Sequence, residues 1–366
     1  MGDAAGSGPP TVAVGVDPMI APRPNSDICA EVVRDPAMLA GLVADWWRLW
    51  HAAEQPTAFQ SPAWLLPWWS VFGTGDLYAI AVWSEEALVG FAPLYRRPGA
   101  PIQPLGVGIS DQFDLLIDRS VPEAGPMLAR AVESLADRTA TEIELPELAA
   151  GSHAARLLAG RGRLAQGSPC PVLALPEGAD FEAVVPARRR RKMRMAHHRA
   201  EAAGGIEIEA VIGGDAMAAI GDLVRLQTLR WADRDEAPVL ADPAFRTFLE
   251  AAAVPLAEAG LLRLTRLRVD NGVVAVQLGL AGPGHHAAYL GAFDPAFERI
   301  SPGALLMGAA IEAAIAEGAR AFRFLRGGEA YKFAWGAVDR PNGRMVIAPR
   351  DRGHPSSIGR DVFVPA

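Results

Sequence analysis

The sequence predicts an α/β fold of the α+β type, with two tandem domains that each hold a mixed, mostly antiparallel sheet flanked by helices. Two observations support this. The same order of elements (hairpin, strand, helix, strand) can be followed twice along the chain, and half of the residues are apolar, which is enough for large cores. At 366 residues the chain is also long enough for two domains.

The second copy of this order has the clearer pattern. Residues 262–269 alternate apolar with basic or polar side chains, Asp270-Asn271-Gly272 predicts a tight turn, and residues 273–281 return. Asn-Gly between two such runs is a strong hairpin signal. A strand at 286–293, an apolar helix at 304–317 and a strand at 321–325 complete the order.

The first copy repeats it with weaker signals. We expect a hairpin of residues 77–83 and 87–95, a strand at 113–117, a helix at 123–138 and a strand at 142–145. Helices come before the hairpin in each half. They are predicted at 38–53 and 61–72, and then at 181–203, 216–231 and 243–259.

A domain boundary is expected near the Gly-Ser-Pro run at Gly167, just before a strand at 170–175. The predicted division is a disordered tail at 1–26, an N-terminal domain at 27–166, a C-terminal domain at 167–348 and a second tail at 349–366. Residues 1–26 are rich in Gly, Pro and Ala and lack periodicity, which is typical of a tail.

The start of the second apolar helix predicts an anion site. Ser301 is expected to cap the helix and Pro302 to be its first residue. Gly303 has no side chain, so a ligand can approach the backbone N–H groups of the first turn, which also includes Ala304 and Leu305. Free N–H groups and the helix dipole suit a phosphate or pyrophosphate.

Composition excludes several classes of protein. The net charge of −7 gives no support to nucleic acid as a main partner. No apolar run approaches the length of a membrane span, and no secretory signal is recognisable. Cys29 and Cys170 belong to no CxxC pair, so we expect neither a metal site nor a disulfide, and a cytoplasmic protein fits.

Several spaced motifs together resemble a known family. In the C-terminal half they are Asp294 at a strand end, the Ser301-Pro302-Gly303 helix start, Arg326-Gly327, Tyr331-Lys332 and Trp335. The N-terminal half adds a further set: Phe59, Pro62, Trp64, the run Gly90-Phe91-Ala92-Pro93-Leu94, Leu105-Gly106, Ser110-Asp111 and Asp114.

From about residue 35 to about residue 348, this set resembles the GNAT-fold N-acyltransferases. The most similar group is bacterial and has two fused GNAT domains; it contains the CelD-like proteins and the FemAB-like peptidyltransferases. Two features depart from the pattern. Arg323 stands where members of the group usually carry an acid, and the Gln/Arg-x-x-Gly-x-Gly/Ala loop of simpler GNAT enzymes is absent.

The resemblance implies acyl transfer from a thioester to an amine, with acyl-CoA as co-substrate. Ser301, Gly303, Ala304 and Leu305 would bind the donor phosphates. Tyr331 would protonate the leaving thiolate. The remaining candidates are the bases Asp111 and Asp294, with Asp114 and Glu298 as alternatives, and the substrate-binding residues Lys332, Arg323, Asp114 and Arg326. Arg323 lies on an otherwise apolar strand face, so it either pairs with an acid or binds an anionic ligand.

The acceptor is expected to be a small amine, an amino sugar or a lipid-like amine. A dense positive run on the helix at 181–203 is a solvated face, a binding surface for phosphate-bearing substrates, or a contact with the inner membrane face. Two alternatives to the acyl-CoA enzyme stay open. One is aminoacyl transfer from charged tRNA in cell-envelope synthesis; the other is a non-catalytic GNAT partner in polysaccharide biosynthesis. The sequence leaves the oligomeric state open.

Overall fold

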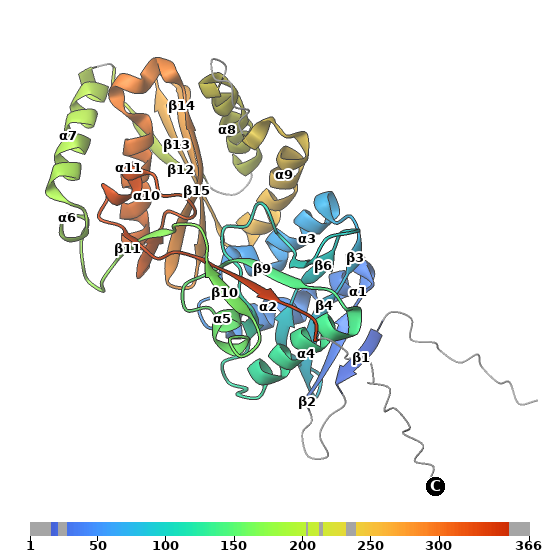
Figure 1. Cartoon of the computed structure of the whole chain (residues 1–366). Coiled ribbons are helices and arrows are strands. Elements are labelled where there is room, and N and C mark those ends of the chain that lie inside the picture. The colour runs from blue at the N-terminus through green and yellow to red at the C-terminus, as the bar shows by residue number, and fades with distance from the viewer. Residues whose placement is uncertain (1–15, 21–27, 203, 212–214, 232–238, 351–366) are drawn as a thin grey trace, which may run out of the picture.

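The structure is a computed structural model and describes residues 16–20, 28–202, 204–211, 215–231 and 239–350. The N-terminal half (blue to green) and the C-terminal half (green to orange) lie side by side, as Figure 1 shows. Each half contains a hairpin, a strand, a helix and a strand in that order, so the predicted repeat is confirmed.

The N-terminal half holds two sheets. The first has the order β1-β2-β4-β5-β8. Its strands are β1 (Val16–Ile20), β2 (Ile28–Val33), β4 (Ala79–Ser84), β5 (Ala87–Ala92) and β8 (Leu116–Ile117). The second has the order β10-β18-β9-β7-β6-β3. Its strands are β3 (Asp76–Leu77), β6 (Leu94–Arg96), β7 (Ile102–Pro104), β9 (Ile143–Leu148), β10 (Arg163–Gln166) and β18 (Gly343–Ile347).

Helices cover the first of these sheets because their apolar faces match its strands. Helix α4 packs on β2, β4 and β5, and α2 packs on β5 and β8. The α-helices of this half are α1 (Pro36–Gly41), α2 (Val43–Ala52), α3 (Pro62–Phe72), α4 (Ala124–Thr139) and α5 (His153–Leu157), and a 3-10 turn, η1 (Ala58–Gln60), precedes α3. Asp35 caps α1 and Ser152 caps α5 through their side-chain oxygens.

The C-terminal half has one sheet with the order β12-β13-β14-β15-β16-β11-β17. All neighbours are antiparallel except β15 and β16, which are parallel. Its strands are β11 (Pro171–Ala174), β12 (Glu207–Val211), β13 (Leu262–Val269), β14 (Gly272–Gly282), β15 (His285–Phe293), β16 (Ala321–Arg323) and β17 (Val338–Asp339).

Helices lie on both faces of this sheet. Figure 1 shows α10 and α7 on one side of β13–β15, and α8 and α9 on the other. The helical elements of this half are α6 (Phe181–Val184), α7 (Ala187–Ala202), α8 (Ala216–Trp231), η3 (Val239–Ala241), α9 (Pro243–Glu258), η4 (Pro295–Ile300), α10 (Pro302–Ala316) and α11 (Ala330–Phe333).

One apolar core runs from the N-terminal half into the C-terminal half. Trp64 on α3 packs edge-to-face on Phe248 of α9, with ring centroids 4.8 Å apart. It also packs on Tyr289 of β15 at 5.3 Å. Because α3 and α9 bury these rings in a shared core, the two halves are held in contact by apolar burial as well as by polar contacts.

Strand pairing revises the predicted division of the chain. Residues 343–347, assigned by the sequence to the C-terminal domain, form β18 between β9 and β10 of the N-terminal half. Figure 1 shows this red strand crossing between the halves. Within the predicted tail at 1–26, Val16–Ile20 forms β1 and pairs with β2. The other residues of that tail, and 351–366, lie outside the described ranges.

Two predicted elements differ in detail. The basic helix expected at 181–203 is two helices, α6 and α7, because Pro186 has no N–H to donate and Val185 before it takes an extended conformation. The strand expected at 113–117 is reduced to Leu116–Ile117. Its start is diverted because the Asp114 carboxylate accepts backbone N–H groups, including that of Leu115.

Candidate active site

A cavity of about 740 Å³ opens between β15 and the segment after β16 of the C-terminal sheet, and Asp111 of the N-terminal half also lines it. Segments far apart in sequence meet there: the loop at Asp111, the later part of β15, the first turn of α10, and the loop with α11 that follows β16. Most of its apolar wall comes from β15 and α10, with Leu290, Phe293, Leu306 and Met307.

The cavity exists because β15 and β16 separate. Their parallel pairing covers only His285–Ala287 against Ala321–Arg323, and no pairing between them is recorded beyond this in the described residues. From Ala288 to Phe293, β15 therefore faces the cavity on one edge while it pairs with β14 on the other. An exposed strand edge of this kind can hydrogen-bond an extended ligand that carries amide groups.

The first turn of α10 is more closed than the sequence predicted. Ser301 takes a left-handed conformation (φ 55°), and its hydroxyl accepts no capping bond from the helix. Its N–H donates to the carbonyl of Glu298, while Ala304 and Leu305 both donate to the carbonyl of Ser301. Since Pro302 has no N–H, Gly303 carries the one free backbone donor of this turn among the described residues.

Of the four predicted donor-binding residues, Gly303 and Ala304 line the cavity. Leu305 is buried in the core instead, at 1% exposure. The Ser301 hydroxyl accepts a hydrogen bond from Arg199 of α7 at 3.4 Å. The predicted anion site therefore consists of one glycine N–H at a helix start, with a cation of α7 close to it.

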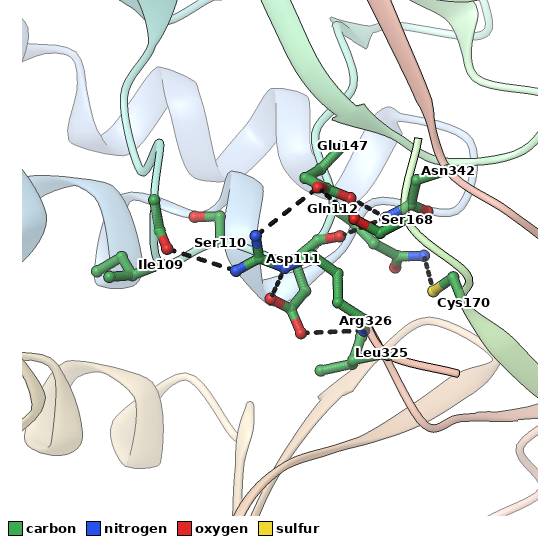
Figure 2. Close-up of polar contacts among 12 residues, drawn as sticks. Ile109, Ser110, Asp111, Gln112, Glu147, Ser168, Cys170, Leu325, Arg326 and Asn342 are labelled. Atoms are coloured by element: carbon green, nitrogen blue, oxygen red, sulfur yellow. Dashed lines mark hydrogen bonds and ion pairs between the residues drawn. The ribbon is translucent and has the colours of Figure 1, made fainter. Parts of the chain in front are cut away.

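Asp111 joins the two halves at the wall of the cavity. Its carboxylate accepts from Nε of Arg326 at 2.5 Å and from the backbone N–H of Arg326 at 3.2 Å. Arg326 also lies 3.7 Å from a carboxylate oxygen of Glu147, and Asn342 donates to the Asp111 carbonyl at 2.8 Å. Figure 2 shows these side chains converging from the N-terminal half and from the segment after β16.

The chemistry of Asp111 follows from its burial. Burial raises the pKa of its carboxyl group above the usual value, and the charge and hydrogen bonds of Arg326 only partly oppose this rise. Both carboxylate oxygens hold Arg326, so Asp111 fixes the loop at 325–327. Of the four predicted bases, Asp111 is the one that lines this cavity.

Lys332 was expected to bind an anionic group. It is 3% exposed, and its ammonium group donates to the carbonyls of Leu325, Arg326 and Gly327 and lies 3.0 Å from a carboxylate oxygen of Glu329. Because its donors are already used, we infer that Lys332 holds the loop after β16 in place rather than receiving a substrate anion.

Tyr331 is placed as predicted, at the cavity. It lies on the short helix α11 rather than on a loop, lines the cavity and is 48% exposed. Trp335, from the same motif, is fully buried, and its ring forms part of the cavity wall. The catalytic role of Tyr331 stays a prediction.

Two predicted acids lie elsewhere. Asp294 caps the 3-10 turn η4 by accepting from the N–H of Ala296 at 2.9 Å and does not line the cavity. Asp114 accepts from the N–H groups of Leu115, His153 and Ala154, each at 2.8 Å, and so anchors the start of α5. Asp114 lines a different, smaller cavity together with Arg323.

Sequence reasoning missed two residues of the main cavity. Arg189 of α7 lies over the ring of Trp335, with its guanidinium carbon 4.0 Å from the ring centroid. Tyr289 of β15 donates its hydroxyl to the carbonyl of Ile109 at 2.8 Å, across the contact between the halves. Arg189 is one of several consecutive arginines, so the sequence did not single it out. The sequence around Tyr289 contains no signal that distinguishes it from an aromatic residue of the core.

Comparisons with known proteins agree with this architecture. Residues 187–333 match a family model described as an acetyltransferase (GNAT) domain. No curated protein sequence matches the chain. A crystal structure of FemX is similar in fold, with a TM-score of 0.63 and 13% identity, over 83% of this chain and 95% of that one.

Two further solved structures share the fold. The C-terminal domain of a putative lysylphosphatidylglycerol synthetase from Agrobacterium fabrum has a TM-score of 0.56 and 12% identity, over 84% of this chain and 92% of that one. L-PGS from Bacillus licheniformis has a TM-score of 0.56 and 11% identity, over 88% of this chain and 94% of that one. At these identities the likeness shows the fold alone.

Within the described ranges, no three His, Cys, Asp or Glu side chains converge in a way that could hold a metal ion. No helix in the same ranges is both long and apolar enough to cross a membrane.

Proposed function

We propose that this protein, a member of the GNAT superfamily with two tandem GNAT-like domains, transfers an acyl group from a CoA thioester to an amine. The observation that carries the proposal is the opening between β15 and β16, which ends at the start of α10. The pantetheine arm, which contains two amides, would pair with the free edge of β15. A phosphate of CoA would then meet the N–H of Gly303.

The chemical step needs one proton to leave the amine and one to reach the leaving sulfur. The amine nitrogen attacks the thioester carbonyl carbon, and the carbon–sulfur bond breaks as the amide forms. We assign the proton of the amine to Asp111, through a water molecule, and the proton given to the thiolate to the hydroxyl of Tyr331. Both groups line the cavity.

The acceptor would be a small amine, an amino sugar or a lipid-like amine. The apolar wall of β15 and α10 suits an acyl chain. The exposed cations of α7 would favour contact with an anionic membrane face for a lipid-like acceptor. They are Arg188, Arg191, Lys192, Arg194 and Arg199.

Calorimetric titration with acetyl-CoA and with a long-chain acyl-CoA tests the donor. The variant Gly303→Glu is suited to this because a Cβ at that position would lie 3.7 Å from Phe293, which is ordinary contact, so the fold should accept it. Its carboxylate would repel the donor phosphate, and we expect affinity to fall at least about tenfold. The matched control is Gly221→Glu on α8, an exposed glycine with open space around it.

Binding by the wild type and by Gly221→Glu, with loss in Gly303→Glu, would support the donor site. The acyl chain length that the protein prefers would then distinguish small-metabolite chemistry from lipid chemistry. If the wild type binds neither thioester, the acyl-CoA proposal is wrong.

A second candidate is transfer of an aminoacyl group from charged tRNA. The observation in its favour is the position of α7, which packs on α10 and contributes Arg189 to the cavity wall. Buried Met193, Ala196 and Ala200 form its packed face, so its other cations point away from the core. A strand of RNA that entered the cavity would pass them.

Aminoacyl transfer from a mixture of charged tRNAs tests this candidate. The double variant Arg191→Glu/Arg194→Glu should abolish it, whereas Arg119→Glu, an exposed arginine of the N-terminal half, should not. Transfer that is unaffected by the double variant would contradict the role of α7, and the absence of any transfer from charged tRNA would contradict this candidate. If neither thioester nor charged tRNA binds, the remaining candidate is a non-catalytic partner.

A further inference from the structure

A second cavity, of about 270 Å³, lies between the halves and is separate from the main one. The N-terminal half supplies most of its wall, from the turn at Thr57 and Gln60 and the start of α5. The C-terminal half contributes Arg323, at the end of β16. The two cavities share no lining residue: Asp111 lines the first, and its neighbour Gln112 lines the second.

Arg323 has an incomplete set of partners. Its Nη1 donates to the side-chain oxygen of Gln112 at 2.6 Å, which uses one of the five guanidinium N–H groups. No carboxylate within ion-pair distance of Arg323 is recorded among the described residues. By contrast, Arg326 contacts Asp111 and Arg266 lies 3.3 Å from Asp222. Arg323 is therefore a partly buried cation that has no counter-charge among the described residues.

The neighbouring thiol does not supply that charge. Gln112 donates to the sulfur of Cys170 at 3.8 Å, so the thiol and Arg323 share one amide, and Figure 2 shows the contact between Gln112 and Cys170. Burial raises the pKa of Cys170 to about 11, and the charge of Asp111 adds to the rise. At neutral pH the thiol is uncharged, and burial lowers the pKa of Arg323, as expected for a cation without compensation.

Two carboxylates share the cavity wall, and neither compensates Arg323. Asp114 is held by three backbone N–H groups and lies 3.3 Å from the ring of His153. Glu54 is at the rim, with its side chain 62% exposed, and lies 3.7 Å from the other ring nitrogen of His153. Arg156, also on this wall, adds a second cation.

We propose that this cavity is a second binding site, which takes a small oxyanion, a phosphate or a carboxylate group, on the guanidinium of Arg323. Arg323 would bind two oxygens of the anion through its parallel N–H groups. Side-chain amides, such as that of Gln60, and the hydroxyl of Ser152 line the rest of the cavity. The site is independent of the donor proposed above and of its cavity.

The test is thermal unfolding with inorganic phosphate or with acetate, at pH 7.5 and an ionic strength fixed with chloride. The full chain is compared with Arg323→Gln, with Gln112→Glu and with the control Arg344→Gln, which removes an exposed cation of β18. Gln112→Glu keeps the side-chain size and places a carboxylate where Arg323 now meets an amide oxygen. The carboxylate of this variant should form an ion pair with the guanidinium of Arg323, so that an added anion cannot bind there.

We expect phosphate or acetate to raise the unfolding midpoint of the wild type and of Arg344→Gln. Arg323→Gln should lose the response, and Gln112→Glu should be more stable without added anion and should not respond. If Arg323→Gln fails to fold, Gln112→Glu decides the question. No response in the wild type, or a full response in Gln112→Glu, would overturn the proposal.

Phosphate could also bind at the start of α10, so the same titration is made in Gly303→Glu. The response assigned to Arg323 should persist there, because that variant blocks only the proposed donor site. Loss of the whole response in Gly303→Glu would place the anion at α10 and refute the second site. Titration with acyl-CoA reports separately on the proposed function.

Discussion

Lowering the pH should destabilise this protein through His285, which lies at the start of β15 and is 5% exposed. Burial lowers the pKa of its imidazole to about 3, and the charge of Arg323 adds to the decrease. A contact of 3.2 Å between Nδ1 and the carbonyl of Pro283 opposes this only in part. The folded protein therefore keeps His285 neutral under conditions in which the unfolded chain protonates it.

The sign and the size of the effect follow from proton linkage. Between the usual histidine pKa of about 6.5 and the folded value of about 3, the unfolded state binds one more proton than the folded state. Stability is thus present above this window and is lost as the pH falls through it. The slope is at most about 1.4 kcal/mol per pH unit, so a drop from pH 6.5 to pH 4.5 costs up to about 3 kcal/mol.

Urea unfolding at several pH values between 7.5 and 4.5 measures this loss. Other groups titrate in the same range, so the wild type is compared with His285→Gln, which removes the titration and keeps a donor for the carbonyl of Pro283. Its stability should fall less steeply with acid. The control His198→Gln removes a histidine whose side chain is 80% exposed and should follow the wild type. Parallel curves for wild type and His285→Gln would refute the reasoning.

Three other changes test the site. Tyr331→Phe should lower kcat about 100-fold with KM nearly unchanged; an unaltered kcat would exclude it as the acid. Tyr289→Phe keeps the edge-to-face ring contacts but loses the hydrogen bond to the carbonyl of Ile109. The free energy of unfolding in urea should therefore fall by about 1 kcal/mol, and no change, as expected if water replaces the hydroxyl, would contradict this. Lys332→Met should lower the free energy of unfolding by about 2 kcal/mol and weaken binding of the acyl donor, because the loop carbonyls lose the ammonium group that they share. An unchanged rate of proteolysis in the 325–327 segment would contradict this.

Local sequence signals were sufficient to place some residues at the cavity. Gly303 and Tyr331 were placed correctly at the cavity, because a helix start and a residue next to a glycine loop are local features. Asp294 also has a local signal, but before Pro295 it serves as a cap. Lys332 also lines the cavity, but the sequence did not show that its ammonium group contacts loop carbonyls, because backbone carbonyls leave no trace in the sequence.

By itself, the sequence determined the fold class, the doubled order of elements and most helix and strand positions. These depend on periodicity, on Asn-Gly and Pro signals and on capping residues, all of which act over a few positions along the chain. Even the break between α6 and α7 could have been read from Pro186.

Only the tertiary structure decided which groups meet. Asp111 contacts Arg326, and Gln112 contacts Arg323. Strand β18 pairs with β10 of the N-terminal half, although nearly 180 residues separate them in the sequence. The direction in which β15 and β16 separate, and therefore the cavity, depends on where pairing stops between strands that are joined through α10. Such contacts depend on the packing of the whole chain. The apolar surface that is buried when they form comes from both halves, so no single segment determines them.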